Sequence, residues 1–187
     1  MAFIGIDEAG RGSWAGPLCV SAVRFEKLSK ERSYFDSKSL TRASRKLLFH
    51  RLQSECQIGL GWVSAASIDR MGLSTALRIA ADTALMQLPI APDDTVIIDG
   101  PINFSSYASA QPEVSADATF EYVSAASIAA KVCRDRYMQW LSTVSCEYGF
   151  EKHVGYGTAF HRQMLLLHGV SSHHRKSFKP ILRMANS

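Results

Sequence analysis

Four acidic residues stand where the sequence predicts buried strands to end or a long helix to begin. Asp7 and Glu8 close the first predicted strand, and Asp99 closes a later one. Asp117 lies a few residues before the longest predicted helix. Because the ends of neighbouring strands meet at one edge of a sheet, we expect these carboxylates to lie close together and to raise one another's pKa.

Carboxylates gathered in this way are suited to divalent cations. Oxygen ligands completed by water are the ligands that Mg²⁺ and Mn²⁺ prefer. Two such ions can hydrolyse a phosphodiester, since one activates a water and the other stabilises the leaving oxygen. The alternative is that the acids are solvated in surface loops. Residues 79–130, which include Asp99 and Asp117, contain seven acids and no Lys or Arg, and this favours the metal site.

The glycines that follow the first strand allow a different interpretation. The segment Gly10-Arg11-Gly12-Ser13-Trp14-Ala15-Gly16 resembles a distorted dinucleotide-binding loop. Such a loop needs a helix directly after it, because the helix N-terminus binds the pyrophosphate. Here residues 17–25 are β-like, and the acids just before the loop would repel phosphate. Dinucleotide binding is therefore disfavoured, and the sequence contains neither a P-loop nor a nucleophile elbow.

The elements that would hold these residues alternate between strands and helices. Residue types and apolar spacing predict strands at 3–7, 18–25, 58–64 and 95–99, and helices at 41–56, 68–88, 122–144 and 158–168. This order predicts an α/β fold with a mixed sheet flanked by helices. We expect a catalytic domain at residues 1–145 and a small, helical, basic C-terminal extension that binds substrate at 146–187, the two forming one compact unit.

Charge is distributed unevenly along the 187 residues. The net charge is +4, but residues 150–187 alone carry six Lys or Arg, one acid and five of the six histidines. Such asymmetry indicates a polyanionic partner. The candidate contacts to a nucleic-acid backbone are Lys152, Arg162, Arg175, Lys176, Lys179 and Arg183, and the alternative for each is a solvated helical face. Lys38, Lys131 and Arg134 are weaker candidates, because they could equally form ion pairs within the chain.

Composition argues against several other classes. Apolar residues make up 47% and charged residues 20%, as in globular rather than disordered proteins. No apolar run approaches the roughly 20 residues of a membrane span, and acids from position 7 onward argue against a secretion signal. The four cysteines contain no C-x-x-C pair, so we expect thiols in a reducing cytoplasm rather than disulfides or a zinc site.

Several short blocks resemble the motifs of the ribonuclease HII family. The most specific is Gly5-Ile6-Asp7-Glu8-Ala9-Gly10-Arg11-Gly12, followed by Ala15-Gly16-Pro17. The other matching blocks are Asp36-Ser37-Lys38-Ser39-Leu40-Thr41, residues 64–69, Ile98-Asp99-Gly100, residues 124–132 with Arg134-Asp135, Gly155-Tyr156-Gly157-Thr158 with His161, and His174-Arg175-Lys176-Ser177-Phe178. These blocks occur in order, so the resemblance covers nearly the whole chain.

The resemblance implies a ribonuclease H-like fold and an endoribonuclease. Such an enzyme hydrolyses the RNA strand of RNA–DNA hybrids. It also cuts on the 5′ side of single ribonucleotides embedded in duplex DNA, leaving 3′-hydroxyl and 5′-phosphate ends. The family's catalytic, metal-binding carboxylates fall on Asp7, Glu8, Asp99 and Asp117, with two divalent ions, Mg²⁺ or Mn²⁺, as cofactors. We expect a cytoplasmic monomer with no membrane association.

The resemblance also assigns contacts to the substrate. The family's glycine loop falls on Gly10, Arg11 and Gly12, and its backbone contacts the ribose 2′-hydroxyl, the group that distinguishes RNA from DNA. A glycine suits this place because a side chain would block the approach. The ribose-sensing tyrosine of the family falls on Tyr156. The further candidate substrate contacts in the matching blocks are Lys38, Thr158 and Arg175.

The chain departs from the family's pattern at three lysines. The usual lysines are missing two residues before Asp117 and at Val154, and the block around Lys38 has one lysine where two are usual. We expect weaker or more salt-sensitive substrate binding, with activity retained because no catalytic carboxylate is lost. The first departure also leaves Glu113 as an alternative to Asp117.

Two other classes stay open at this point. A transposase-like or junction-cutting nuclease would share the carboxylates but would have no use for the glycine loop with Tyr156. Equal cutting of duplex DNA with and without one ribonucleotide would favour it. A non-catalytic nucleic-acid-binding protein is disfavoured because all four acids are present. Ribonuclease HIII, which has an extra N-terminal domain, is disfavoured because the chain begins at the first strand.

Overall fold

The computed structural model describes residues 1–28, 34 and 40–185. Its centre is a five-stranded sheet in the order β3-β2-β1-β4-β5. The strands are β1 (Phe3–Ala9), β2 (Leu18–Phe25), β3 (Gln57–Val63), β4 (Thr95–Asp99) and β5 (Gln111–Glu113). β1, β2 and β3 are antiparallel neighbours, whereas β4 and β5 run parallel to β1. The predicted mixed sheet is thus confirmed.

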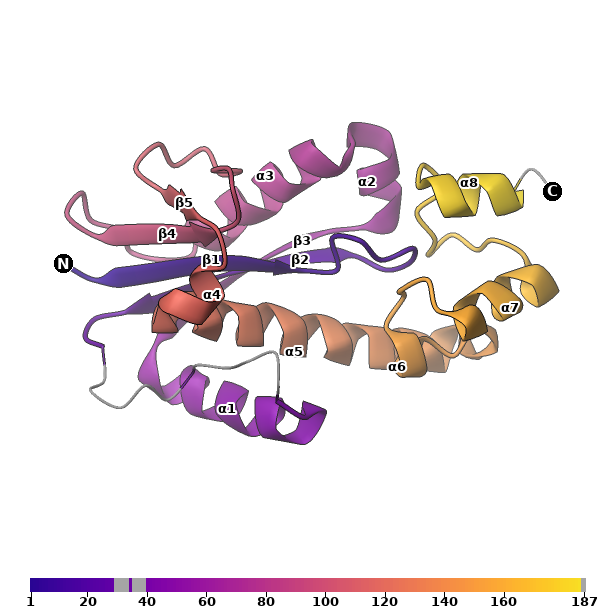
Figure 1. Ribbon diagram of the computed structural model, residues 1–187, viewed down its shortest axis with the longest axis horizontal. Helices are drawn as coiled ribbons and strands as arrows, with labels where there is room; N and C mark the ends of the chain where they lie inside the picture. The colour runs from indigo at the N-terminus through magenta and orange to yellow at the C-terminus, as the bar shows by residue number, and fades with distance from the viewer. Residues whose placement is uncertain (29–33, 35–39, 186–187) are drawn as a thin grey trace.

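Helices cover both faces of this sheet (Figure 1). They are α1 (Arg42–Glu55), α2 (Ala65–Met71), α3 (Leu73–Leu85), α4 (Ala116–Thr119), α5 (Glu121–Val144), α6 (Phe150–His153), α7 (Ala159–His168) and α8 (Lys179–Ala185), with a 3₁₀ turn at Cys146–Tyr148. One apolar core joins the sheet to α3, and a second joins the opposite face to α5 and α1. The sheet is therefore a buried platform whose strand ends are held from both sides.

Alternation along β1 decides which face each side chain of the site occupies. Ile4 and Ile6 belong to the core on the α3 side. Gly5 faces α5 so closely that a Cβ at this position would overlap the carbonyl of Tyr122. Since side chains alternate along a strand, Asp7 points to the α5 side and Glu8 to the other side.

The predicted helix at 68–88 is wrong as a single helix. Gly72 has a φ of 81° and separates α2 from α3, because a left-handed residue interrupts the helical hydrogen bonds. The residue that ends the predicted strand at 58–64, Ser64, instead caps α2 by accepting a hydrogen bond from the Ser67 amide. The short elements β5 and α4 were not predicted, since three or four residues are too few for a periodic signal.

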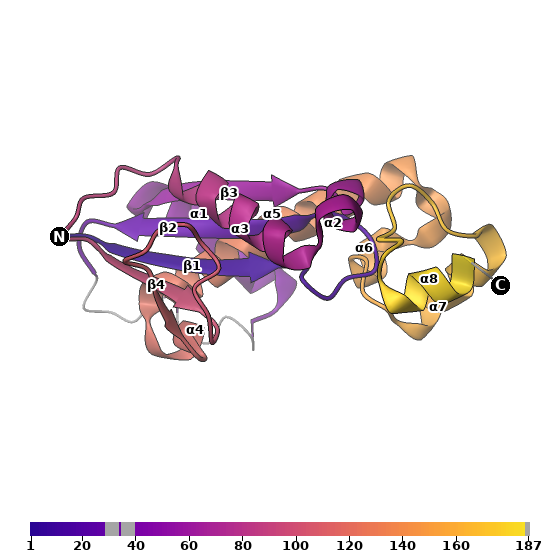
Figure 2. The same cartoon turned by 90° about the horizontal axis from the view of Figure 1, so that it is seen from above.

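The C-terminal helices gather at one end of the molecule, beyond the end of β1 (Figure 2). Their core contains Phe150, Leu165 and Ile181 together with Ala15 from the loop after β1 and Met138 from α5. The division at residue 145 stays a prediction, but the shared core ties this end to the rest of the fold. No described helix is long and apolar enough to cross a membrane.

Candidate active site

Two of the predicted catalytic acids lie side by side at the carboxyl end of the sheet. β1 and β4 are parallel neighbours, with Ile6 opposite Ile98. Asp7 and Asp99 are the next residues of the two strands. The sequence prediction that these strand ends meet is therefore confirmed by the topology.

Asp7 is the most deeply placed acid of the pair, with a relative exposure of 7%. Its Oδ1 accepts a hydrogen bond of 2.7 Å from the Glu8 amide, and the nearby Ser127 side chain of α5 favours the charged form of the carboxyl. Burial, reinforced by the charges of Glu8 and Asp99, raises the pKa of Asp7 to about 8. Near neutral pH the Asp7 carboxyl is therefore largely protonated unless a cation is bound beside it.

Glu8 is partly buried and extends from the opposite face of β1. Its Oε1 lies 3.4 Å from the Arg11 guanidinium, which is half exposed. Burial still raises the pKa of Glu8, although Arg11 opposes the shift. A cation approaching this edge would relieve the same electrostatic cost at Asp7 and at Glu8.

Asp117 directly follows a turn that Asp99 holds. Asp99 Oδ1 accepts a 2.8 Å hydrogen bond from the Ala116 amide, next to Ser115, which has a left-handed φ of 58°. Asp117 follows in α4 and is buried, with 4% exposure. Glu113, the alternative acid, is exposed on the edge strand β5. Burial thus favours Asp117 over Glu113.

The donors at this edge fit a hard divalent cation. All are carboxylates, and two of them have raised pKa values because like charges and burial meet there. Among the described residues, no three His, Cys, Asp or Glu side chains are grouped so that they could hold a metal ion. Mg²⁺ keeps several of its waters and takes only one or two protein carboxylates, so Asp7 and Asp99 could bind it without such a group.

The structure brings the glycine loop next to residues 155–157, which are called the tyrosine loop below. The amides of Trp14 and Ala15 donate to the carbonyl of Gly155, at 2.8 and 3.2 Å. Tyr156, 38% exposed, follows directly. Two segments about 140 residues apart in the sequence therefore form one surface beside the carboxylates.

Two buried arginines, Arg134 and Arg175, support the surface that the glycine loop and the tyrosine loop form. Arg134 donates to the carbonyls of Ala15, Pro17 and Val154 and to the Ser13 hydroxyl, at 2.8–3.2 Å. A Cβ on Gly10 would overlap its guanidinium, and the ring of Tyr156 lies over it with 5.6 Å between ring centroid and Cζ. Sequence reasoning ranked Arg134 only as a weak candidate substrate contact.

Arg175 was predicted to contact phosphate from the solvent side, but its side chain does not face solvent. It is fully buried, and its guanidinium donates to the carbonyls of Gly16 and Arg11 at 2.9–3.1 Å. Burial, with a smaller contribution from Arg134, lowers its pKa to about 9. Its position is that of a residue that shapes the glycine loop.

Two of the other predicted substrate contacts form interactions within the chain. Thr158 caps α7 by accepting a 3.2 Å hydrogen bond from the His161 amide. Lys131 pairs with Asp135 at 2.7 Å. Lys38 lies outside the described residues.

A buried histidine cluster lies under the tyrosine loop, and sequence reasoning did not assign it a role. Nδ1 of His161 lies 3.0 Å from the Tyr156 carbonyl, which can only accept, so this nitrogen carries the proton. Nε2 of His161 then accepts from Nε2 of His174 at 3.0 Å, and Nδ1 of His174 accepts from the Ser171 amide at 3.1 Å. The chain of donors is complete with both imidazoles neutral. The only signal in the sequence is the gathering of histidines after residue 150.

Comparison with solved structures defines the class of protein. The chain superposes on ribonuclease HII of Archaeoglobus fulgidus, solved in complex with PCNA, with a TM-score of 0.83, 26% identity and 96% of each chain covered. It also matches a Bst-RNase HIII crystallised with Mn²⁺, with a TM-score of 0.75, 18% identity, all of this chain and 70% of the other; this match concerns the fold alone. The fold is that of the ribonucleases H.

Sequence comparison narrows the class to one family. The model of the family described as ribonuclease HII matches residues 4–181. The chain is 42% identical to ribonuclease HII of Geobacillus over 96% of its length and 65% of the relative's. It is 41% identical to that of Roseiflexus castenholzii over 98% and 84%. The chain belongs to the ribonuclease HII family, whose members are metal-dependent nucleases.

Proposed function

We propose that this protein cuts a nucleic-acid duplex on the 5′ side of a ribonucleotide, both in RNA–DNA hybrids and at single ribonucleotides within duplex DNA. The observation that carries the proposal is the placing of the glycine loop and Tyr156 as one surface next to Asp7 and Asp99. A hydrolytic site beside a surface of backbone amides and one aromatic ring suits the recognition of a single sugar.

Asp7, Glu8, Asp99 and Asp117 are the proposed ligands of two divalent ions, Mg²⁺ or Mn²⁺. Such ions would activate a water and stabilise the departing 3′-oxygen. The chain's own part is to hold the acids in place: the Glu8 amide holds Asp7, and the Ala116 amide holds Asp99. The products are a 3′-hydroxyl and a 5′-phosphate.

Selection of the ribose is proposed to come from the glycine loop with Tyr156. Gly12 has open space around the position that a Cβ would occupy, so a sugar can approach its backbone closely. The ring of Tyr156 lies against Arg134, which also holds the loop, so both parts of the surface share one buried support. The 2′-hydroxyl is the feature that such a surface can test.

The exposed cations of residues 150–187 are proposed to contact the phosphate backbone. Lys152, Lys176 and Lys179 are exposed members of this group. Arg175 takes part indirectly, by shaping the loop. Each true phosphate contact should add about one unit to the slope of log affinity against log salt.

Replacement of one carboxylate tests the proposed chemistry. Asp99→Asn keeps an oxygen that can accept from the Ala116 amide but removes the charge. We expect an unchanged melting temperature and a turnover lower by about 100-fold or more, since metal-assisted stabilisation of the reaction is lost. Full activity of this variant, or full activity of the native protein in EDTA, would refute the proposal.

A further inference from the structure

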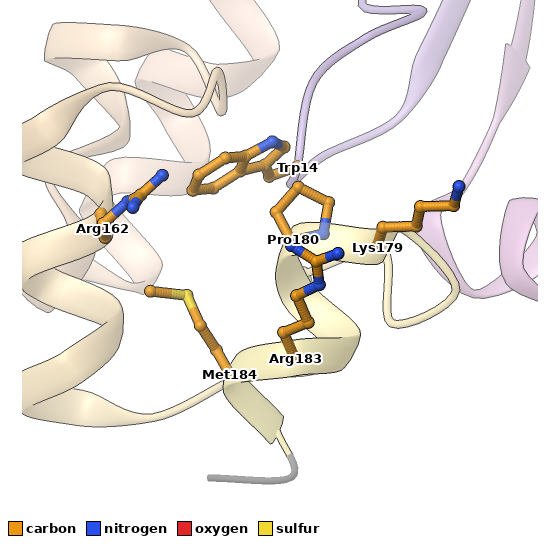
Figure 3. Close-up of a pocket in the computed structure, with 6 residues that line it drawn as sticks. All are labelled: Trp14, Arg162, Lys179, Pro180, Arg183 and Met184. Carbon is orange, nitrogen blue, oxygen red and sulfur yellow. The ribbon is translucent and has the colours of Figure 1, made fainter.

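A pocket of about 300 Å³ opens beside the glycine loop, outside the carboxylate site. It is formed by three separate segments: the loop after β1, helix α7 and helix α8. Figure 3 shows Trp14 facing Met184 across the opening, with Arg162 on one side and Pro180 with Arg183 on the other. Lys179 completes the lining at the edge.

The residues that line the pocket carry positive charge. Its cations are Arg162, Lys179 and Arg183, and no acid lines the pocket. Over the part of the chain that the structure describes, neither Arg162 nor Lys179 forms a salt bridge. Residues 150–187 supply one acid in all, Glu151. Cations that converge in this way attract an anion.

Half of the residues that line the pocket are apolar or aromatic, which a bare anion would not require. These residues are Trp14, Pro180 and Met184. One face of the indole lies directly on Gly157, where a Cβ would overlap the ring. The Arg162 guanidinium carbon lies 5.8 Å from the centroid of the indole. Arg162 thus lies over the indole, and an aromatic ring combined with an arginine is a pairing that proteins use to bind an unstacked nucleobase and its phosphate.

Trp14 is held in place before any ligand arrives. The Trp14 amide donates to the Gly155 carbonyl at 2.8 Å, and the Trp14 carbonyl accepts from the Arg175 amide at 2.7 Å. The backbone of Trp14 is thus fixed between the tyrosine loop and the segment before α8. Little conformational freedom remains to be lost on binding.

We propose that this pocket binds one unpaired nucleotide of the substrate strand, with its phosphate among Arg162, Lys179 and Arg183 and its base against Trp14. The inference rests on the proposed function, because it needs a nucleic acid on the adjoining loop surface. A volume of about 300 Å³ fits one nucleotide and is too small for a base pair with its backbone. A duplex that frays or ends near the site would therefore bind more tightly than a continuous one.

The test measures affinity for all-DNA duplexes that the protein binds without cutting. One set has blunt ends, and the other carries a single-stranded extension of five nucleotides at a 5′ or a 3′ end. The length of the duplex is varied, so that the extension begins at different distances from the duplex centre. We expect at least one extension to improve affinity about 10-fold, which is within the range for one stacked base. Trp14→Leu and Arg162→Ala should remove that gain, and Trp14→Phe should keep most of it.

Two control variants distinguish an effect of the pocket from the effect of removing any exposed cation or any exposed aromatic ring. Lys152→Ala removes an exposed cation from the same end of the chain but outside the pocket lining, and Trp140→Leu removes an exposed indole from α5. Neither control should change the gain from an extension. The absence of a gain with every extension, or an equal loss on blunt and extended duplexes in Arg162→Ala, would overturn the proposal.

A second arm distinguishes a strand from a free nucleotide. Adenosine and thymidine monophosphates are titrated as competitors of the extended duplex. Competition at micromolar concentration would assign the pocket to a free nucleotide and overturn the proposal, whereas none below the millimolar range supports it. Because binding is measured on all-DNA duplexes, loss of ribonucleotide cleavage would refute the proposed function without affecting this outcome.

Discussion

At the scale of single residues, the central feature is a carboxylate that the fold places at an energetic cost. The pKa of Asp7 rises to about 8 because the group is buried beside Glu8 and Asp99. When the pKa of an acid is higher in the folded state than in the unfolded state, the folded protein loses stability as the pH rises between these two pKa values. Without a cation the carboxyl is therefore largely protonated at neutral pH, and a bound cation would favour its charged form.

Neutralising this residue should separate stability from activity. Asp7→Asn removes the buried charge, so we expect it to raise the melting temperature at pH 8 in EDTA by about 3 °C or more, since 1 kcal/mol corresponds to about 2–4 °C for a chain of this size. Turnover should be lost. Glu113→Gln, at an exposed acid, is the control and should leave both unchanged. A lower melting temperature for Asp7→Asn at pH 8 would contradict the assigned burial cost.

Two glycines of the same loop offer a matched comparison. Gly10 has a φ of 86° and its Cβ position is occupied by Arg134, whereas Gly12 has no neighbour there. Gly10→Ala should therefore destabilise the fold by about 1–3 kcal/mol. Gly12→Ala should leave the melting temperature unchanged and yet lower kcat/KM at a single ribonucleotide. Unaltered activity in Gly12→Ala would show that the sugar does not approach this residue.

At the scale of elements, the C-terminal helices depend on neutral histidines. Burial is the main cause that lowers the pKa of His161 to about 4 and that of His174 to about 3. The unfolded chain binds protons at these groups from about pH 6.5 downward. Stability from the cluster is therefore complete above pH 6.5 and is lost as the pH falls toward 4.

Acid should thus weaken the end of the molecule that carries Tyr156. Asp7 and Glu8, whose pKa values are both raised, have the opposite dependence on pH, so the measurement is made in the double variant Asp7→Asn, Glu8→Gln. In that background we expect the free energy of unfolding to fall by up to about 1.4 kcal/mol per pH unit for each histidine between pH 6 and pH 4. Denaturant titrations at these pH values measure it. A flat profile would mean that the histidines are accessible to protons in the folded state.

Arg175 and Lys176 are adjacent in sequence but should behave differently. Arg175→Ala would leave the carbonyls of Gly16 and Arg11 without their donor, at a cost of about 2–4 kcal/mol, and should not change the salt dependence of binding directly. Lys176→Ala should leave stability unchanged and lower the salt slope by about one. The reverse pattern, measured by unfolding and by binding across salt concentrations, would return Arg175 to the phosphate contacts.

The elements also show how far the sequence could be interpreted. The ends of β1 and β4 were predictable because short apolar runs ending in acids leave a clear signal, and their meeting follows from parallel pairing. The break at Gly72 was not, since apolar spacing continues across it. The buried roles of Arg134 and Arg175 were also hidden, because a guanidinium that binds carbonyls and one that binds phosphate have the same residue type.

At the scale of the whole molecule, the uneven charge acquires a spatial meaning. The acidic middle of the sequence supplies Asp99 and Asp117 to the end of the sheet, and the basic tail folds into the helices that lie beyond β1 (Figure 1). The loop after β1 joins the two, because its residues are held by Arg134 from α5 and by Arg175 from the tail. Chemistry and duplex binding are thus proposed to occupy neighbouring regions linked by one loop.

Mapping of cleavage sites tests the central claim most directly. The substrates are two duplexes of the same sequence, one all DNA and one with a single ribonucleotide, each incubated with Mg²⁺, with Mn²⁺ and with EDTA. We predict one cut, on the 5′ side of the ribonucleotide, with 3′-hydroxyl and 5′-phosphate ends, and no cut in the all-DNA duplex or in EDTA. Equal cutting of both duplexes, or cutting that persists in EDTA, would contradict the account.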